Sequence, residues 1–266
     1  MLRFRSLTSG SAGNATLIQA TDGTALRPAR LLVDCGLSIR QIERRLQSAG
    51  VALADLDALF ITHEHADHLG QALPLALRAR IPVWASQGTW DAALAAADCA
   101  LAQSIAPLMR IARDRKPIAI GALLIEPFTV PHDAREPLQL RVSDGARRLG
   151  LLTDLGHVTP HALDMLQGCQ ALLLESNHDP DLLERSSYPP FLKRRIQGPL
   201  GHLSNTQAQQ VLARIKHPGL TTAVAAHLSE RNNHPQRVQA CWAETLGCTP
   251  SEVRVSSRNG LDWIEV

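Results

Sequence analysis

The chain has 266 residues, of which 45% are hydrophobic and 3% aromatic, and its 27 basic and 25 acidic residues leave a net charge of +2. This length allows one large domain or two small ones, and the charge gives no general reason to expect a nucleic-acid-binding protein. Membrane proteins are excluded, because no segment approaches the roughly 18 apolar residues of a spanning helix. No signal sequence is recognisable, so we expect a cytoplasmic protein, and five cysteines without CxxC spacing are expected to be free thiols.

The first part of the chain alternates short apolar runs with turns. Because short apolar runs bounded by turn residues are typical of buried strands, we predict strands at 2–7, 15–20, 30–33, 56–61 and 81–85. A turn is predicted at Asp22-Gly23. Ser38 is suited to cap a helix that runs to about Gln47, and further helices are predicted at 69–80 and 89–97.

One short stretch carries most of the chemical information. His63, His65, Asp67 and His68 fall within six positions, directly after the strand predicted at 56–61. Imidazole and carboxylate groups together suit a divalent metal ion, and ordinary core packing has no need for three histidines this close together. We therefore predict a metal site on a loop between a strand and a helix.

The second part of the chain repeats the rhythm of the first. Two short strands are predicted within 118–130, and further strands at 138–142, 148–153, 171–174, 221–226, 253–256 and 261–266. Helices are predicted at 159–167, 204–215 and 236–246. Hairpins followed by alternating strands and helices, twice over, indicate two sheets packed face to face with helices outside, in the α/β class. Because the sequence shows no linker-like stretch and no short repeat, we predict a single domain over 1–266.

Isolated polar residues end several of these strands. Asp34, His132, Asp154 and His227 each stand just after an apolar run. Loops that follow the strands gather at one rim of the sheets, so these side chains are candidates to complete a site begun by the histidine cluster. A hydrogen-bonded polar group at a strand end is the alternative for each of them.

The cluster His-x-His-x-Asp-His resembles the metal motif of the metallo-β-lactamase superfamily. The resemblance implies an αβ/βα sandwich with two mixed β-sheets, and it assigns His63, His65 and His132 to one ion. It assigns Asp67, His68 and His227 to a second ion, with Asp154 bridging the two. Asp34 matches an aspartate that supports the ligands by hydrogen bonds. Zn²⁺ is the first choice for both ions because the ligands are rich in histidine, and Mn²⁺ is the alternative.

Later motifs narrow the resemblance. In order, Glu175, the loop Gly201-His202-Leu203-Ser204 and the run His227-Leu228-Ser229 resemble late elements of ribonuclease Z. Together with the motifs at 9–14, 62–68, 130–134 and 153–156, they resemble the YycJ/WalJ-like family over nearly the whole chain. The resemblance implies a nuclease, in particular 5′-to-3′ exonuclease action on DNA.

The expected mechanism is hydrolysis by a hydroxide that bridges the two ions, since two cations lower the pKa of water towards neutrality. Asp67 would orient this nucleophile. His202 would protonate the leaving oxygen, held by Glu175, although phosphate binding or helix capping is the alternative for His202. The same site on another substrate class would give a carboxylic ester, thioester or lactone hydrolase, and a scaffold protein that keeps a metal for stability is the non-enzymatic alternative.

A small polar loop follows the first strand. Ser9, Ser11 and Asn14 stand among glycines whose neighbouring N–H groups suit a phosphate, and Asn177 beside Glu175 is a further candidate for substrate binding. A tight hairpin turn is the equally good alternative. The basic runs at 44–45, 147–148 and 193–195 are candidates for nucleic-acid contact or simply solvated faces.

Overall fold

The computed structural model describes residues 1–21, 23 and 26–266. Part of the turn predicted at Asp22-Gly23 therefore lies outside the described residues. The first of two sheets has the strand order β14-β1-β2-β3-β4-β5-β6. Its strands, in chain order, are β1 (Leu2–Thr8), β2 (Ala15–Ala20), β3 (Ala29–Val33), β4 (Ala58–Phe60), β5 (Val83–Ala85), β6 (Met109–Ile111) and β14 (Ile264–Glu265).

The second sheet has the order β13-β12-β11-β10-β9-β8-β7. Its strands are β7 (Ile118–Ile120), β8 (Leu123–Thr129), β9 (Leu138–Ser143), β10 (Arg148–Leu152), β11 (Ala171–Glu175), β12 (Thr222–Ala226) and β13 (Arg254–Val255). In both sheets antiparallel strands come first and parallel strands follow: β3 to β6 are parallel, and so are β10 to β13. The prediction of two mixed sheets is confirmed.

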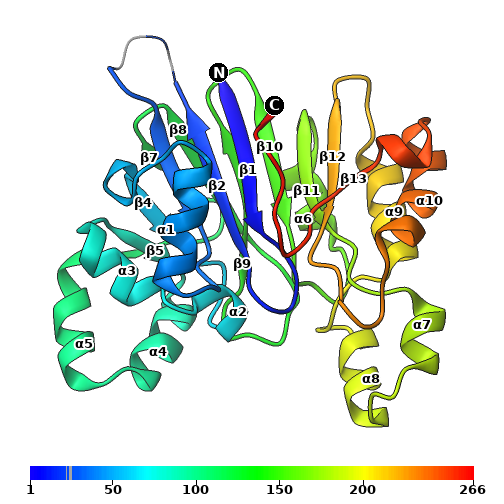
Figure 1. Ribbon diagram of the computed structural model, residues 1–266, viewed down its shortest axis with the longest axis horizontal. Coiled ribbons are helices and arrows are strands. Elements are labelled where there is room, and N and C mark those ends of the chain that lie inside the picture. Colours follow the sequence, from blue (N-terminus) through cyan, green and yellow to red (C-terminus); the bar gives the residue numbers. More distant parts are fainter. Residues whose placement is uncertain (22, 24–25) are drawn as a thin grey trace.

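Helices cover the outer face of each sheet (Figure 1). The segments that connect β3 to β6 of the first sheet contain α1 (Ile39–Ser48), α2 (Ala66–Leu69), α3 (Ala72–Ala79), α4 (Gln87–Ala96) and α5 (Cys99–Ile105), with short 3₁₀ turns η1 (Leu53–Asp55) and η2 (Ala106–Leu108). The second sheet carries α6 (Pro160–Leu166), α7 (Pro180–Arg185), α8 (Pro190–Gln197), α9 (Asn205–Ile215), α10 (Pro235–Leu246) and η3 (Pro250–Glu252). No helix in the described ranges is long and apolar enough to span a membrane.

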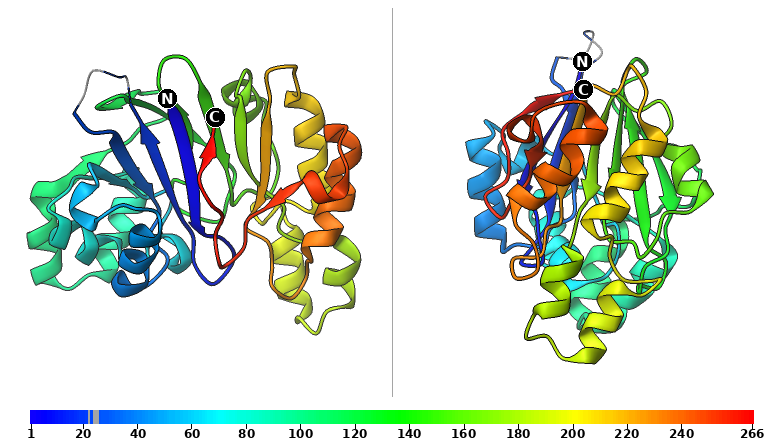
Figure 2. Two further views of the ribbon diagram at one scale, coloured as in Figure 1. Left: turned by 45° about the horizontal axis from the view of Figure 1, so that its top comes forward. Right: turned by 90° about the vertical axis from the view of Figure 1, so that its right-hand side faces the viewer.

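The core consists of three layers of apolar side chains between four layers of backbone. In β3, Leu31 and Val33 face the other sheet, whereas Leu32 faces the helices. The opposite sheet repeats this alternation, with Leu173 between the sheets and Leu172 under the helices. Successive side chains of a strand point to opposite faces, so strands buried on both faces must be continuously apolar. This confirms the αβ/βα sandwich, whose two sheets lie side by side in Figure 2.

Several predicted elements differ from the structure. The helix predicted at 69–80 is two helices, α2 and α3, because Gly70 has a positive φ of 36° and lies against the carbonyl oxygen of Cys35. The last predicted strands, at 253–256 and 261–266, shorten to two residues each. The elements that were not predicted include α5, the short edge strand β6, α7, α8 and the short 3₁₀ turns η1, η2 and η3. For α7 a signal was present, since Asp179 caps the helix and Pro180 occupies its first position.

Candidate metal centre

The carboxyl ends of the parallel strands meet at one edge of the two sheets, the lower edge in Figure 1, where α2 lies. Asp34 follows β3, Asp154 lies two residues after β10, Glu175 ends β11 and His227 follows β12. Ligand sites in open α/β sheets lie beyond the carboxyl ends of strands for this topological reason. Asp34, Asp154 and His227 also have left-handed backbone conformations, with φ of 62°, 56° and 54°. Such conformations at non-glycine residues re-aim a side chain at a cost of order 1–3 kcal/mol each.

Three imidazoles form a first group. The Nε2 atom of His63 lies 3.0 Å from Nδ1 of His65, and Nε2 of His132 lies 3.3 Å from the same Nδ1. Ligands at about 2.0–2.1 Å from a tetrahedral Zn²⁺ are separated by roughly 3.3–3.4 Å. The three nitrogens are therefore spaced as three ligands of one small divalent ion, and the donor set fits such an ion.

A second group lies beside the first. The Oδ2 atom of Asp67 is 3.3 Å from Nε2 of His227 and 3.5 Å from Nε2 of His68. These three side chains come from α2 and from the loop after β12, far apart in the sequence. All four side-chain groups that can hold a metal ion in the described chain belong to this one region, and their ligand atoms lie within 4.8 Å of one another in each group.

Asp154 lies between the two groups. Its Oδ2 atom is 3.1 Å from Nε2 of His68, and it is also grouped with His63. This oxygen is buried, and its contact with His68 lacks hydrogen-bond geometry, so it accepts no hydrogen bond within the described chain. A buried carboxylate oxygen that accepts no hydrogen bond is costly, and a cation fits such an atom well. The structure thus brings His63, His65, Asp67, His68, His132, Asp154 and His227 together in one region, and their binding of two ions stays a prediction.

Each imidazole that faces the centre is held through its other nitrogen. Asp34 accepts from Nδ1 of His68 at 2.8 Å, Glu175 Oε1 lies 3.0 Å from Nδ1 of His227, and the carbonyl of Gly201 is 3.1 Å from Nδ1 of His132. Such contacts orient a ligand and raise its basicity. The carbonyl of Asp133 does the same for Nε2 of His65 at 3.2 Å.

Sequence reasoning missed Thr62 and Asp133. Thr62 donates to Asp34 through its backbone N–H at 2.9 Å, and its hydroxyl lies 3.0 Å from Nδ1 of His63. Asp133 places a carboxylate 3.4 Å from Nε2 of His132. Their positions directly before His63 and after His132 were the available signal.

The carboxylates set the charge of the histidines. Burial lowers the pKa of His227, but Asp154, Asp67 and Glu175 outweigh it and raise the pKa to about 10. His63, which is buried and faces other histidines, has its pKa lowered well below the ordinary value. Protons and metal ions compete for the same nitrogens, so metal binding at this centre releases protons.

His202 lies over the junction of the two groups. Its ring centroid is 5.2 Å from that of His132 and 5.3 Å from that of His227. Its Nδ1 lies 2.8 Å from Oε1 of the fully buried Glu175, whose Oε2 accepts from the backbone N–H of Leu203 at 2.9 Å. Its Nε2 makes no hydrogen bond within the described residues, and its side chain is 21% exposed. The imidazole is thus fixed on one side and open on the other.

Three of the four candidates for phosphate contact, Ser9, Asn14 and Asn177, have other partners. The Ser9 hydroxyl accepts the backbone N–H of His227 at 2.7 Å, and Asn177 donates to the carbonyl of His227 at 3.0 Å. Asn14 donates to Asp67 Oδ2 at 3.2 Å and closes a turn onto Gly10. All three are buried, and Ser11 alone is exposed. These contacts position the centre, and phosphate binding by these residues stays a prediction.

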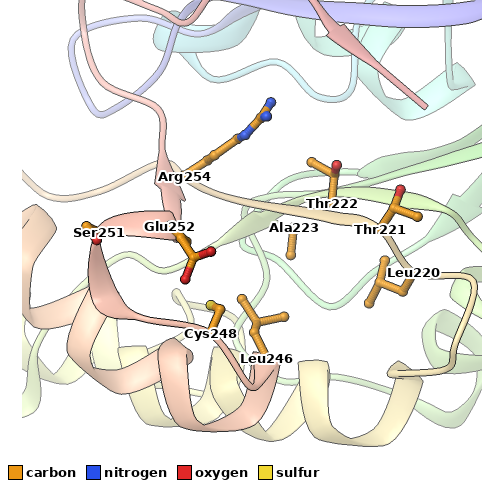
Figure 3. Close-up of a pocket in the computed structure, with 9 residues that line it drawn as sticks. All are labelled: Leu220, Thr221, Thr222, Ala223, Leu246, Cys248, Ser251, Glu252 and Arg254. Carbon is orange, nitrogen blue, oxygen red and sulfur yellow. The ribbon is translucent and has the colours of Figure 1, made fainter.

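A pocket lies elsewhere, at the opposite end of β12 from His227 (Figure 3). It is lined by Thr222, Cys248, Glu252 and Arg254 among others, with no histidine. Nothing in its lining resembles the metal centre.

Comparisons with known proteins agree with the geometry. A family model described as a Beta-lactamase superfamily domain matches residues 29–228. Exodeoxyribonuclease YycJ of Bacillus anthracis is 33% identical over 92% of this chain and 89% of its own length, and Exodeoxyribonuclease WalJ of Streptococcus pneumoniae is 32% identical over 87% and 83%. The crystal structure of the metallo-β-lactamase fold protein YhfI of Bacillus subtilis superimposes with a TM-score of 0.72, covering 100% of this chain and 99% of that one, at 15% identity. The chain therefore belongs to the metallo-β-lactamase superfamily and, within it, to the YycJ/WalJ-like family.

Proposed function

We propose that this protein is a metal-dependent nuclease that removes nucleotides from the 5′ end of DNA. The observation that carries the proposal is His202, which presents an open Nε2 beside both ligand groups while Glu175 holds its Nδ1. The relatives named exodeoxyribonuclease, which match nearly the whole chain, favour DNA over RNA and a phosphodiester over a carboxylic ester.

Two divalent ions complete the site in this proposal. His63, His65 and His132 would hold one, Asp67, His68 and His227 would hold the other, and Asp154 would serve both. Bound there, the ions would lower the pKa of water and neutralise charge on the scissile phosphate. The imidazole-rich donor set favours Zn²⁺, and Mn²⁺ is the alternative because two of the seven ligand residues, Asp67 and Asp154, are carboxylates and the site would act on a phosphoryl group.

The side chains of the protein then handle protons and orientation. Asp67 orients the attacking water, since its carboxylate belongs to the second ligand group and is the partly exposed side chain of that group. His202 Nε2 donates a proton to the leaving oxygen, a role worth roughly 10²–10⁴ in rate. Glu175 is a positioning residue, because it accepts from His202 and His227 and so keeps both rings in place.

The test replaces His202 by alanine in protein loaded with Zn²⁺ or Mn²⁺. We expect turnover on 5′-phosphorylated DNA to fall about 10²–10⁴-fold with both ions still bound. His161→Ala is the matched control, since His161 is also half-buried and also paired with a carboxylate, Asp114 at 2.7 Å, outside the metal centre. Wild-type turnover in His202→Ala, or hydrolysis of esters and lactones but of no oligonucleotide by the wild type, would contradict the proposal. The lengths of the products from DNA and RNA substrates, each with a 5′-phosphate or a 5′-hydroxyl, report the direction in which the enzyme degrades the strand.

A further inference from the structure

Arg195, in the last turn of α8, is joined to the metal centre through Asp133. Its Nε donates to Oδ2 of Asp133 at 2.6 Å. Asp133 lies against the first group of imidazoles, because its carbonyl accepts from Nε2 of His65 at 3.2 Å and its Oδ1 lies 3.4 Å from Nε2 of His132. One aspartate therefore separates the Arg195 guanidinium from two candidate metal ligands, and Figures 1 and 2 show α8 at the same end of the molecule as α2.

The backbone fixes both partners of this ion pair. The N–H of Asp133 donates to the carbonyl of Leu200 at 3.1 Å. Arg195 directly precedes Ile196, whose carbonyl accepts the N–H of His202 at 2.9 Å. The segment that carries His202 is therefore tied to the end of α8, so Arg195 and His202 are held in a fixed relation to each other beside the centre.

The Arg195 guanidinium keeps most of its donors free. Nε is the one atom of this side chain that makes a hydrogen bond within the described residues, and the side chain is 58% exposed. A guanidinium has five N–H donors in a rigid plane, so about four remain on Nη1 and Nη2. A carboxylate that holds Nε fixes this plane, and the terminal nitrogens then match two oxygens of a phosphate. The side chain is therefore oriented to receive a phosphate.

Carboxylates of the centre act on this positive charge. The hydrogen bond to Asp133 raises the pKa of Arg195, burial opposes it, and the Asp67 carboxylate raises it further. Asp67 belongs to the second ligand group, whereas Asp133 lies against the first. The guanidinium is therefore within electrostatic reach of both groups, and a fixed cation at this place attracts a polyanion towards the centre.

We propose that Nη1 and Nη2 of Arg195 bind the substrate phosphate next to the scissile one, with Asp133 holding the guanidinium in place. The inference rests on the proposed nuclease function and identifies a residue that positions its DNA substrate. Because Asp133 lies between Arg195 and the imidazoles, the guanidinium lies outside the ligand groups, whereas the scissile phosphate would lie against the ions. The neighbouring phosphate is the next anion along a nucleic-acid strand. Contacts to phosphates fix the register of a strand without reading its bases.

The test measures binding without hydrolysis, by fluorescence anisotropy of a 3′-labelled, phosphorothioate-linked oligodeoxynucleotide on the metal-loaded protein, as a single strand and as a duplex. We expect Arg195→Ala to raise Kd roughly 10- to 100-fold for both forms, the effect of one lost charge-assisted contact. The slope of log Kd against log salt should fall by about 0.9 on the duplex, the share of one phosphate contact. Arg195→Lys should keep the slope but not the affinity, because lysine has the charge without the planar fork.

Kinetics separate substrate positioning from a purely structural role. Bis(p-nitrophenyl) phosphate contains only a scissile phosphate, so the ratio of kcat/KM on DNA to kcat/KM on this ester should fall roughly 10- to 100-fold in Arg195→Ala. Arg78→Ala is the matched control, because Arg78 is 60% exposed and pairs with Glu43 at 2.9 Å between α3 and α1. An unchanged ratio, with metal content and both activities reduced together, would show that Arg195 only supports the centre and would overturn the proposal.

The outcomes also distinguish this inference from the proposed nuclease. Cleavage of DNA by the wild type, with equal Kd in the wild type, Arg195→Ala and Arg78→Ala, overturns the Arg195 site and leaves the nuclease standing. DNA binding that is weakened only in the Arg195 variants supports the site even if no DNA is cleaved, in which case the nuclease is wrong. If the wild type neither binds nor cleaves DNA, both proposals are wrong.

Discussion

Replacing Asp34 by asparagine tests whether the groups behind the ligands determine metal affinity. The change keeps the shape of the side chain and suits the left-handed backbone at this position, which asparagine tolerates well. Asp34 Oδ1 accepts the backbone N–H of Thr62 at 2.9 Å, and Oδ2 accepts from His68 Nδ1 at 2.8 Å. Both oxygens therefore face donors, and the Thr62 hydroxyl lies 3.0 Å from each.

An amide cannot satisfy this arrangement in either orientation. If its oxygen faces His68, its NH₂ group faces the N–H of Thr62, and if it is turned over, NH₂ faces the ring N–H of His68. A buried donor left against a donor costs about 1–3 kcal/mol. Because the clash opposes the His68 orientation that a metal ion requires, we expect the affinity of one ion to fall roughly 10- to 100-fold, the range found for such supporting carboxylates.

The assay is competition for Zn²⁺ with a chelator of known affinity, combined with metal content per chain. Asp57→Asn is the matched control, because Asp57 also accepts a backbone N–H, that of Arg30 at 2.8 Å, and pairs with Arg27 away from the centre. Equal metal affinities in Asp34→Asn, Asp57→Asn and the wild type would refute the reasoning that Asp34 acts through His68.

Two further predictions follow from close packing and from burial. Gly36→Ala would place a Cβ atom 1.9 Å from the carbonyl oxygen of Asp67. We therefore expect the free energy of unfolding, measured by urea unfolding, to fall by about 1–3 kcal/mol and the metal content to fall with it, and an unchanged free energy of unfolding would contradict this prediction. Burial lowers the pKa of His178 to about 4. Below pH 6.5 the His178 side chain is therefore protonated in the unfolded chain but stays neutral in the folded chain. The folded chain loses stability as the pH falls from 6.5 to 4. His178→Phe, which also removes a buried unpartnered Nδ1, should reduce this loss by up to about 3 kcal/mol in metal-free protein, and an unchanged pH dependence would count against the assignment.

The sequence was most informative where the fold follows from simple periodicity. Asp34, Asp154 and His227 could be found because each comes after a short apolar strand, and the carboxyl ends of parallel strands meet at one edge. Their convergence on the cluster at 63–68 then needed only the two-sheet arrangement that the strand and helix order predicts.

Other features depend on tertiary contacts that no local pattern contains. Ser9 and Asn14 occupy a glycine-rich turn that suits phosphate binding, yet they are buried because that turn lies against α2 and the loop of His227. Helix α8 was missed because a prolyl-prolyl start and a basic run are equally typical of an exposed loop. Its interest comes from where Arg195 lies relative to Asp133, which only the folded chain reveals.

Backbone strain concentrates where the centre is assembled. Five non-glycine residues of the described chain have a positive φ, and three of them are Asp34, Asp154 and His227. All three follow strands. If the extended backbone of the strand continued through these residues, their side chains would point beyond the edge of the sheet instead of towards the metal centre. Aspartate and histidine are among the residues that tolerate this conformation best, so the residue types that suit the metal also reduce the cost of the turn. The remaining cost is offset by contacts such as Ser9 to the N–H of His227, and a bound ion would add to them, so removing metal should destabilise the folded chain.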